Sequence, residues 1–160
     1  MLSLGIDESY TRVGIAITDD DRHVIAVNSY GYKGCKCKTE KRRFMKRLVK
    51  HALDKYKPDV VMIERVRTFS QGFISTAYIQ ATGALIATIV DTAYPQPVYS
   101  CDTRSWKSQV IGPQKRHAGK VVSVDFIRKR YGFDLDDDAA HAICISLYSW
   151  CDGKKVKIEK

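Results

Sequence analysis

The chain has no apolar run approaching the roughly 20 residues that a membrane-spanning helix needs. Its start, Met1-Leu2-Ser3, also lacks the basic residues of a signal peptide. These two absences predict a cytoplasmic protein without a membrane segment. No internal repeat and no linker divides the 160 residues. We therefore expect a single domain over residues 1–152, followed by a charged tail over residues 153–160.

Paired Cys-x-x-Cys motifs are absent as well. The five cysteines are an odd number, and only two of them stand close together: Cys35, Cys37, Cys101, Cys144 and Cys151. This pattern predicts free thiols in a reducing compartment rather than a disulfide framework. Cys35 and Cys37 could begin a zinc site, but no second close pair completes it.

Acidic residues are scarce relative to basic ones. Lys and Arg total 27 against 18 Asp and Glu, which gives a formal net charge of +9. Because neutralising phosphates releases condensed counterions, such an excess favours a polyanionic partner, above all a nucleic acid. The alternative is a basic surface without a specific partner.

Apolar runs and changes of period predict the order of elements. Strands are expected at Leu2–Asp7, Arg12–Thr18, His23–Val27, Asp59–Glu64 and Val98–Cys101. Helices are expected at Thr39–Lys57, Ile74–Tyr94, Thr103–Ile111, Lys120–Tyr131 and from Asp137 to about Cys151. This order predicts an α/β fold with a five-stranded mixed sheet, in which a three-strand antiparallel meander is joined by two parallel strands and helices cover both faces.

The helices differ in their expected surroundings. Helix 39–57 has an apolar row, which we expect to face inward: Phe44, Leu48, Ala52 and Tyr56. Helix 120–131 is expected to bury Val121, Val124, Phe126 and Ile127. Helix 74–94 is too apolar for a one-sided surface helix, so it is either covered by the domain or, as we favour, partly packed on a second copy of the chain.

Two apolar strands end on carboxylates, Asp7 and Glu64. If these strands are neighbours, their acids emerge close together and repel unless a cation lies between them. The last helix opens with Asp136, Asp137 and Asp138, of which at least one is expected to be a simple helix cap.

Asp138 and His141 stand three residues apart and therefore share one helix face. With Asp7 and Glu64 they predict a site for hard divalent cations, because mostly oxygen ligands suit Mg²⁺ or Mn²⁺. The alternative for Asp7 is a turn cap, and for His141 a hydrogen-bonded core residue.

Three motifs resemble the active-site motifs of RuvC-type Holliday junction resolvases within the RNase H-like superfamily: Leu4-Gly5-Ile6-Asp7, Ile63-Glu64 and Asp138-Ala139-Ala140-His141-Ala142. The order of strands and helices resembles that fold along nearly the whole chain. The resemblance implies a homodimer that cuts branched DNA symmetrically with divalent metal, Mg²⁺ or Mn²⁺, two ions per subunit. Asp7, Glu64 and Asp138 fall on the family's acidic positions.

Lys107 falls near a family lysine that contacts the scissile region, and Lys120 falls near a second one after a two-residue shift. The chain departs from the family pattern at His141, where many relatives have Asp. It also departs in the loop after Glu64, where relatives wedge an aromatic residue into the junction. Arg67 occupies the nearest position here, and Phe69 or Phe73 could serve only after a shift.

The predicted activity is hydrolysis of a DNA phosphodiester, with Asp7, Glu64, Asp138 and His141 as metal ligands and Lys107 steadying the phosphate. The residues expected to contact the DNA are Arg65, Arg67, Phe69, Phe73, Arg104, Lys107, Lys115, Arg116 and Lys120. Two alternatives stay open: a ribonuclease of the same fold that processes structured RNA, and a branched-DNA binding module with a weak site. An actin-like ATPase would need two such domains and glycine-rich phosphate loops, which the sequence lacks.

Overall fold

The computed structural model describes residues 1–9, 11–64, 83, 85, 87, 89, 94–113, 119 and 121–158. Its strands are β1 (Leu2–Glu8), β2 (Arg12–Asp19), β3 (Val24–Gly31), β4 (Val60–Glu64), β5 (Val98–Cys101) and β6 (Val156–Lys157). Its helices are α1 (Lys38–Tyr56), α3 (Thr103–Trp106), the π-helical turn η1 (Lys107–Ile111), α4 (Val121–Tyr131) and α5 (Asp137–Tyr148). No helix in this described part is long and apolar enough to cross a membrane.

The strands form one mixed sheet in the order β3-β2-β1-β4-β5-β6. β1, β2 and β3 pair antiparallel as a meander, and β4 and β5 continue the sheet parallel to β1. The predicted α/β fold is therefore confirmed, with one strand more than expected. That strand, β6, pairs antiparallel with β5 and lies within residues 153–160, for which the sequence predicts only a charged tail. A two-residue edge strand carries no apolar run that would reveal it in the sequence.

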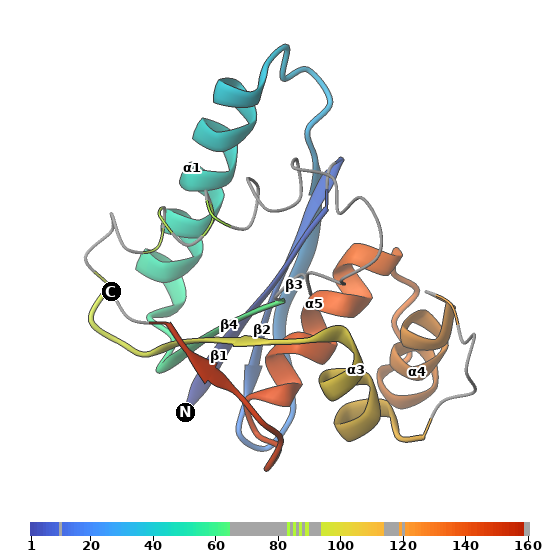
Figure 1. Cartoon of the computed structure of the whole chain (residues 1–160). Helices are drawn as coiled ribbons and strands as arrows, with labels where there is room; N and C mark the ends of the chain where they lie inside the picture. Colours follow the sequence, from blue (N-terminus) through green and yellow to red (C-terminus); the bar gives the residue numbers. More distant parts are fainter. Residues whose placement is uncertain are drawn as a thin grey trace, which may run out of the picture.

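Helices cover both faces of the sheet (Figure 1). α1 lies on one face, and α5 lies on the other with α3 and α4 beside it. Because side chains alternate along a strand, β1 presents Leu4 and Ile6 to the α1 side, whereas Gly5 and Asp7 face α5. Asp7 therefore projects from the sheet toward α5.

α5 lies unusually close to the sheet, because two glycines face it. A Cβ added to Gly5 would stand 2.3 Å from the Ala142 carbonyl oxygen, and one added to Gly14 would stand 2.1 Å from the Asp138 carbonyl oxygen. Any larger residue would push the helix outward, and such overpacking costs about 1–3 kcal/mol. Gly14 is also the register partner of Asp7, so the close approach brings the start of α5 over the end of β1.

Buried hydroxyls fix the position of α5 along the sheet. Ser146 Oγ donates to the Ser3 carbonyl oxygen at 2.9 Å and lies 2.9 Å from Thr18 Oγ1. Thr18 Oγ1 in turn accepts from Trp150 Nε1 at 3.1 Å. Directional bonds of this kind specify one register, which burial of apolar area alone does not.

Two predicted helix faces need correction. In α1 the fully buried residues are Met45, Val49, Ala52 and Leu53, whereas Phe44, Leu48 and Tyr56 are only partly buried. Residues four apart drift by about 40° per step around a helix, so a row at that spacing leaves the buried face. In α4, Val121 is 66% exposed, Val124 and Phe126 are partly buried, and Ile127 is fully buried.

Other elements match more closely. β3 runs four residues beyond the predicted strand, and the predicted helix 103–111 is split into α3 and the π-helical η1. Of the predicted helix 74–94, the structure describes residues 83, 85, 87 and 89 as helical, with Leu85 and Ile89 buried. Tyr94 is no longer helical, and the remaining residues of that helix lie outside the described part.

Candidate active site

Asp7, near the end of β1, is almost completely buried, and its side chain is 7% exposed. Its Oδ2 lies 3.1 Å from Nδ1 of His141, on the second turn of α5. An ionised carboxylate at such a place requires a partner, because burial without one is costly. The imidazole is one such partner.

His141 is held from two sides. Beside its contact with Asp7, its ring lies 5.3 Å from the Trp106 ring, measured between centroids, at an interplanar angle of 57°. The other nitrogen, Nε2, is buried and has no hydrogen-bond partner among the described residues. A buried imidazole nitrogen normally has a proton donor, an acceptor or a metal, so this orphaned atom is the strongest sign of a ligand site.

Glu64 ends β4, the strand beside β1. Its Oε1 accepts hydrogen bonds from Trp106 Nε1 at 3.1 Å and from Thr103 Oγ1. Burial raises the pKa of the Glu64 carboxyl, and the nearby Asp7 carboxylate raises it further. Two like charges thus favour the arrival of a cation at this edge of the sheet.

The three acids at the start of α5 have different environments. Asp136 is the N-cap: its Oδ1 accepts from the Ala139 N–H at 2.9 Å. The expectation that at least one of the three caps the helix is confirmed. The Asp138 side chain is only 6% exposed, whereas that of Asp136 is 39% exposed. Asp138 is therefore the one that lies over Gly14 and toward the sheet.

Arg12 ties this helix start to the meander. Its terminal nitrogen donates to Asp136 Oδ2 at 2.8 Å and to Ser29 Oγ at 2.6 Å, and its Nε lies 3.5 Å from Asp138 Oδ2. Ser29 also donates to Asp136. The clamp (Arg12, Ser29 and Asp136) fixes the first turn of α5, and with it the direction of Asp138.

The donor set suits a divalent metal. Three carboxylates and one imidazole are ligands for Mg²⁺ or Mn²⁺, and the orphaned His141 Nε2 supports this fit. The ligand atoms of the four residues are more widely spaced than those of two other groups, whose atoms lie within 4.8 Å of one another. Those groups are Asp136, Asp137 and Asp138, and, at the connection from β2 to β3, Asp19, Asp21 and His23.

Only some of the predicted DNA contacts can be located. Lys107 begins η1, and its Nζ lies 5.4 Å from the centroid of the Trp106 ring. Arg104 is exposed on α3. The other predicted contacts lie outside the described residues: Arg65, Arg67, Phe69, Phe73, Lys115, Arg116 and Lys120.

Besides Arg12, three residues near the site escaped the sequence reasoning. Trp106 and Thr103 hydrogen-bond Glu64, and a buried tryptophan that needs an acceptor for its N–H was the available signal. Glu8 follows Asp7 but points to the opposite face of the sheet, beside Tyr32. Burial raises the pKa of Glu8 to about 7, and the Asp7 carboxylate contributes to the rise.

No family model matches the chain. Among curated proteins, it is similar to the crossover junction endodeoxyribonuclease RuvC of Pseudarthrobacter chlorophenolicus. The two are 30% identical over an alignment of 165 positions, which covers 97% of this chain and 83% of that protein. It is also 28% identical to the RuvC protein of Paenarthrobacter aurescens over an alignment of 160 positions. This alignment covers 94% of this chain and 82% of that protein.

The fold is also that of a solved relative. The structure of Thermus thermophilus RuvC in complex with a Holliday junction substrate matches with a TM-score of 0.73 and 17% identity, over 96% of this chain and 99% of that one. At this identity the likeness shows the fold alone. The near-full-length sequence matches confirm the predicted family: the chain belongs to the RuvC family of crossover junction endodeoxyribonucleases.

Proposed function

We propose that the chain is a metal-dependent endonuclease that binds Holliday junctions and other branched DNA and cuts their phosphodiester bonds by hydrolysis. The observation that carries the proposal is the buried pair of Asp7 and His141, whose Nε2 has no partner among the described residues. Family membership supports the same activity.

The residues that would hold the metal are Asp7, Glu64, Asp138 and His141, for two Mg²⁺ or Mn²⁺ ions per subunit. Such ions lower the pKa of an attacking water and stabilise the leaving 3′ oxygen. The chain itself supplies the geometry. Trp106 and Thr103 hold the Glu64 carboxylate, and the Arg12 clamp holds the first turn of α5.

His141 has a second role in this proposal. Its Nδ1 faces Asp7, so the hydrogen bond between them fixes both the ring orientation and the tautomer that leaves Nε2 available as a ligand. A histidine at a position where many relatives carry Asp removes one carboxylate from the site. We therefore expect a metal preference shifted toward ions that accept nitrogen ligands, such as Mn²⁺.

Lys107 directly follows Trp106 in the sequence. Its side chain extends along the Trp106 ring, whose N–H binds Glu64. We propose that the Lys107 ammonium neutralises the charge of the scissile phosphate. Arg104 and the predicted contacts outside the described residues would follow the DNA backbone, which positions the substrate without reading its sequence.

The active unit in this proposal is a homodimer in which each copy of the chain contributes one nuclease domain. Two sites related by a two-fold axis suit a substrate with two-fold symmetry, and they would nick opposite strands at matching positions. The apolar helix predicted over residues 74–94 is the proposed contact between the two copies.

The test is cleavage of a synthetic Holliday junction beside a three-way junction, a linear duplex and a structured RNA, with all nicks mapped. We expect two symmetric nicks in the Holliday junction, products that disappear with EDTA and return with Mn²⁺, and little cutting of the duplex. Preferential cutting of the RNA would favour the ribonuclease instead. Binding without any metal-dependent product would indicate a binding module.

A further inference from the structure

Most of the chain's excess positive charge is concentrated in one helix. The 19 residues of α1 include eight Lys and Arg and only two acids, an excess of six within a chain whose net charge is +9. The remaining 141 residues thus contribute only three. None of the residues proposed above to contact the junction belongs to α1, so this charge has no role in the proposed cleavage site.

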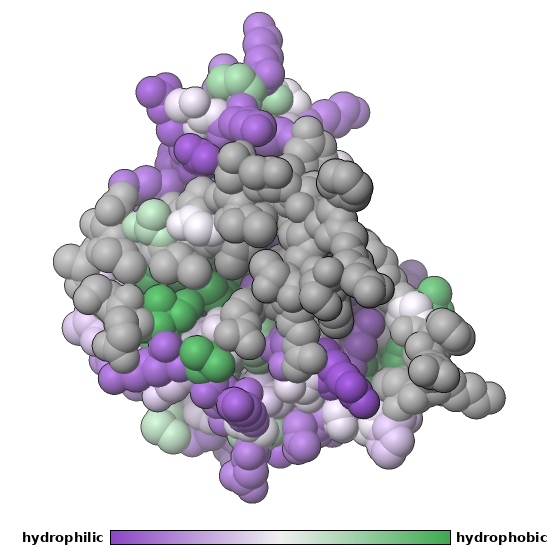
Figure 2. All heavy atoms as spheres, in the orientation of Figure 1, coloured by the Kyte–Doolittle hydropathy of each residue, from purple (hydrophilic) through white to green (hydrophobic). Residues whose placement is uncertain are grey.

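The basic side chains of α1 lie opposite its buried face. Met45, Val49 and Leu53 pack on the sheet, whereas Arg43 and Arg47 are exposed, one turn apart on the outer side. Neither arginine has a hydrogen bond or ion pair with any described residue. Figure 2 shows hydrophilic side chains gathered over the part of the molecule where α1 begins.

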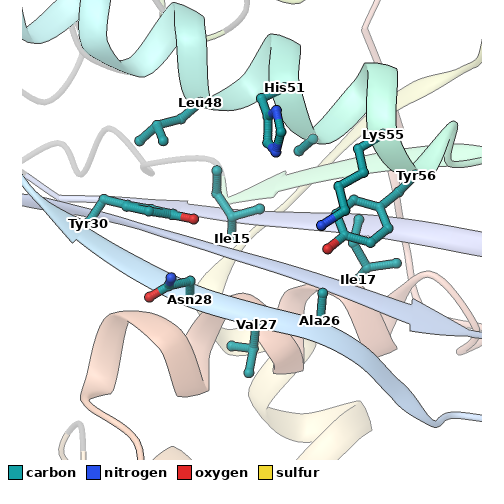
Figure 3. Close-up of a pocket in the computed structure, with 11 residues that line it drawn as sticks. Ile15, Ile17, Ala26, Val27, Asn28, Tyr30, Leu48, His51, Lys55 and Tyr56 are labelled. Atoms are coloured by element: carbon teal, nitrogen blue, oxygen red, sulfur yellow. The ribbon is translucent and has the colours of Figure 1, made fainter.

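A groove between α1 and the edge strand β3 continues this surface. Its volume is about 250 Å³, and none of the described residues that line it is acidic. His51 and Lys55 enter it from α1, while Tyr30 and Asn28 enter it from β3 (Figure 3). Lys55 Nζ lies 5.0 Å from the centroid of the Tyr56 ring. A cationic groove with tyrosines and an amide offers donors and positive charge to a phosphate group.

The surface is on the other side of the sheet from the catalytic residues. α1 covers one face, whereas Asp7 and Glu64 project toward α5. β3 lies two strands from β1, a separation of about 10 Å, and one turn of a DNA duplex spans about 34 Å. A duplex arm that leaves the active site can therefore pass the edge strand β3 within its first helical turn.

We propose that the outer side of α1 and the α1–β3 groove form a second DNA-contacting surface, which binds the phosphate backbone of a duplex arm away from the point of cleavage. This proposal rests on the proposed function. The surface adds affinity that depends on salt and not on sequence, and it takes no part in the chemical step.

The test compares the double variant Arg43→Gln/Arg47→Gln with a matched control, Lys154→Gln/Lys157→Gln. Both remove two positive charges, but the control residues are exposed near β6, at the opposite edge of the sheet. Arg and Gln have similar helix propensities, so α1 should stay folded, and circular dichroism verifies this. Binding of an uncleaved junction, in Ca²⁺ or EDTA, is measured over a series of salt concentrations.

Each lost phosphate contact changes the slope of log K against log[salt] by about 0.9. We expect the slope of the α1 variant to be less steep than that of the wild type by about 1.8. Between 50 and 200 mM salt, the factor by which its affinity decreases should therefore be about 12 times smaller than for the wild type. The control should keep the wild-type slope. At saturating protein, single-turnover cleavage by both variants should equal that of the wild type.

Equal slopes for the α1 variant and the wild type would overturn the proposal, and so would an equal decrease in the control. A slope that changes for structured RNA but not for DNA would assign the surface to RNA and would also overturn it. Absence of nicks with the wild-type protein would instead contradict the proposed function, whatever the slopes are.

Discussion

His141 Nδ1 lies 3.1 Å from Asp7 Oδ2, across the interface between α5 and β1. The contact joins residues that are 134 positions apart in the sequence. It orients the one nitrogen donor of the site and gives a buried carboxylate its partner. The register of α5 on the sheet, the two glycines beneath it and the Arg12 clamp all serve to hold this pair.

Replacing His141 should separate ligand chemistry from helix packing. We expect His141→Ala to lower single-turnover cleavage in Mg²⁺ by about 100-fold, with junction binding unchanged. His141→Asp, which restores the residue of many relatives, should retain cleavage and shift the metal preference from Mn²⁺ toward Mg²⁺. Cleavage at the wild-type rate by the alanine variant would exclude His141 from the site.

Trp106 should act through Glu64. Trp106→Phe keeps a large apolar ring but removes the N–H that binds Glu64 Oε1 at 3.1 Å. We expect the metal concentration for half-maximal cleavage to increase about 10-fold, with little change in the rate at saturating metal. The measurement is a Mg²⁺ titration of cleavage. An unchanged titration would show that the bond does not position Glu64.

Asp136 should stabilise the fold rather than bind metal. Asp136→Ala removes the cap of α5 and the acceptor for Arg12, so the free energy of unfolding should fall by about 1–2 kcal/mol. Asp136→Asn keeps a capping oxygen and should lose less. Urea denaturation measures both. If instead the alanine variant were fully stable and inactive, Asp136 would be a ligand.

Glu8 should make stability depend on pH. Because its pKa is about 7 in the folded chain and 4.5 is the value for an exposed glutamate, the folded state binds a proton that the unfolded state has lost. The free energy of unfolding therefore decreases as pH rises from about 4.5 to about 7, by up to about 3 kcal/mol, and changes no further above that range.

Glu8→Gln should remove this decrease, since it leaves no group to ionise. Glu40→Gln, at an exposed position of α1, serves as the control and should keep the wild-type dependence. The measurement is urea denaturation in EDTA at pH 5 and pH 8. A wild type that is equally stable at both values would contradict the assignment.

The outline of the site could be predicted from the sequence because local patterns specify it. An apolar run that ends on an acid identifies Asp7 and Glu64, and helical spacing puts Asp138 and His141 on one face. The sheet was predictable for the same reason. The resemblance of the three motifs to a known family then led from this pattern of acids to a predicted nuclease activity.

The remaining features depend on contacts between distant segments. No local pattern reveals that Trp106 and Thr103 reach Glu64, or that Arg12 holds the start of α5. Glu8 reads as one more polar residue at the end of a strand, and only its burial in the folded chain, together with the nearby Asp7 carboxylate, explains its raised pKa. The observed buried face of α1 differs from the predicted one because several adjacent rows of that helix are apolar enough to be buried.

The central claim is that Asp7 is a metal ligand of a junction-cutting active site. Its most direct test is single-turnover cleavage of a labelled Holliday junction in Mg²⁺ by Asp7→Asn, together with binding of the same junction. The asparagine keeps the size of the side chain and an oxygen that can face His141, but removes the charge. We predict normal binding and no detectable cleavage. Cleavage at the wild-type rate would contradict the account.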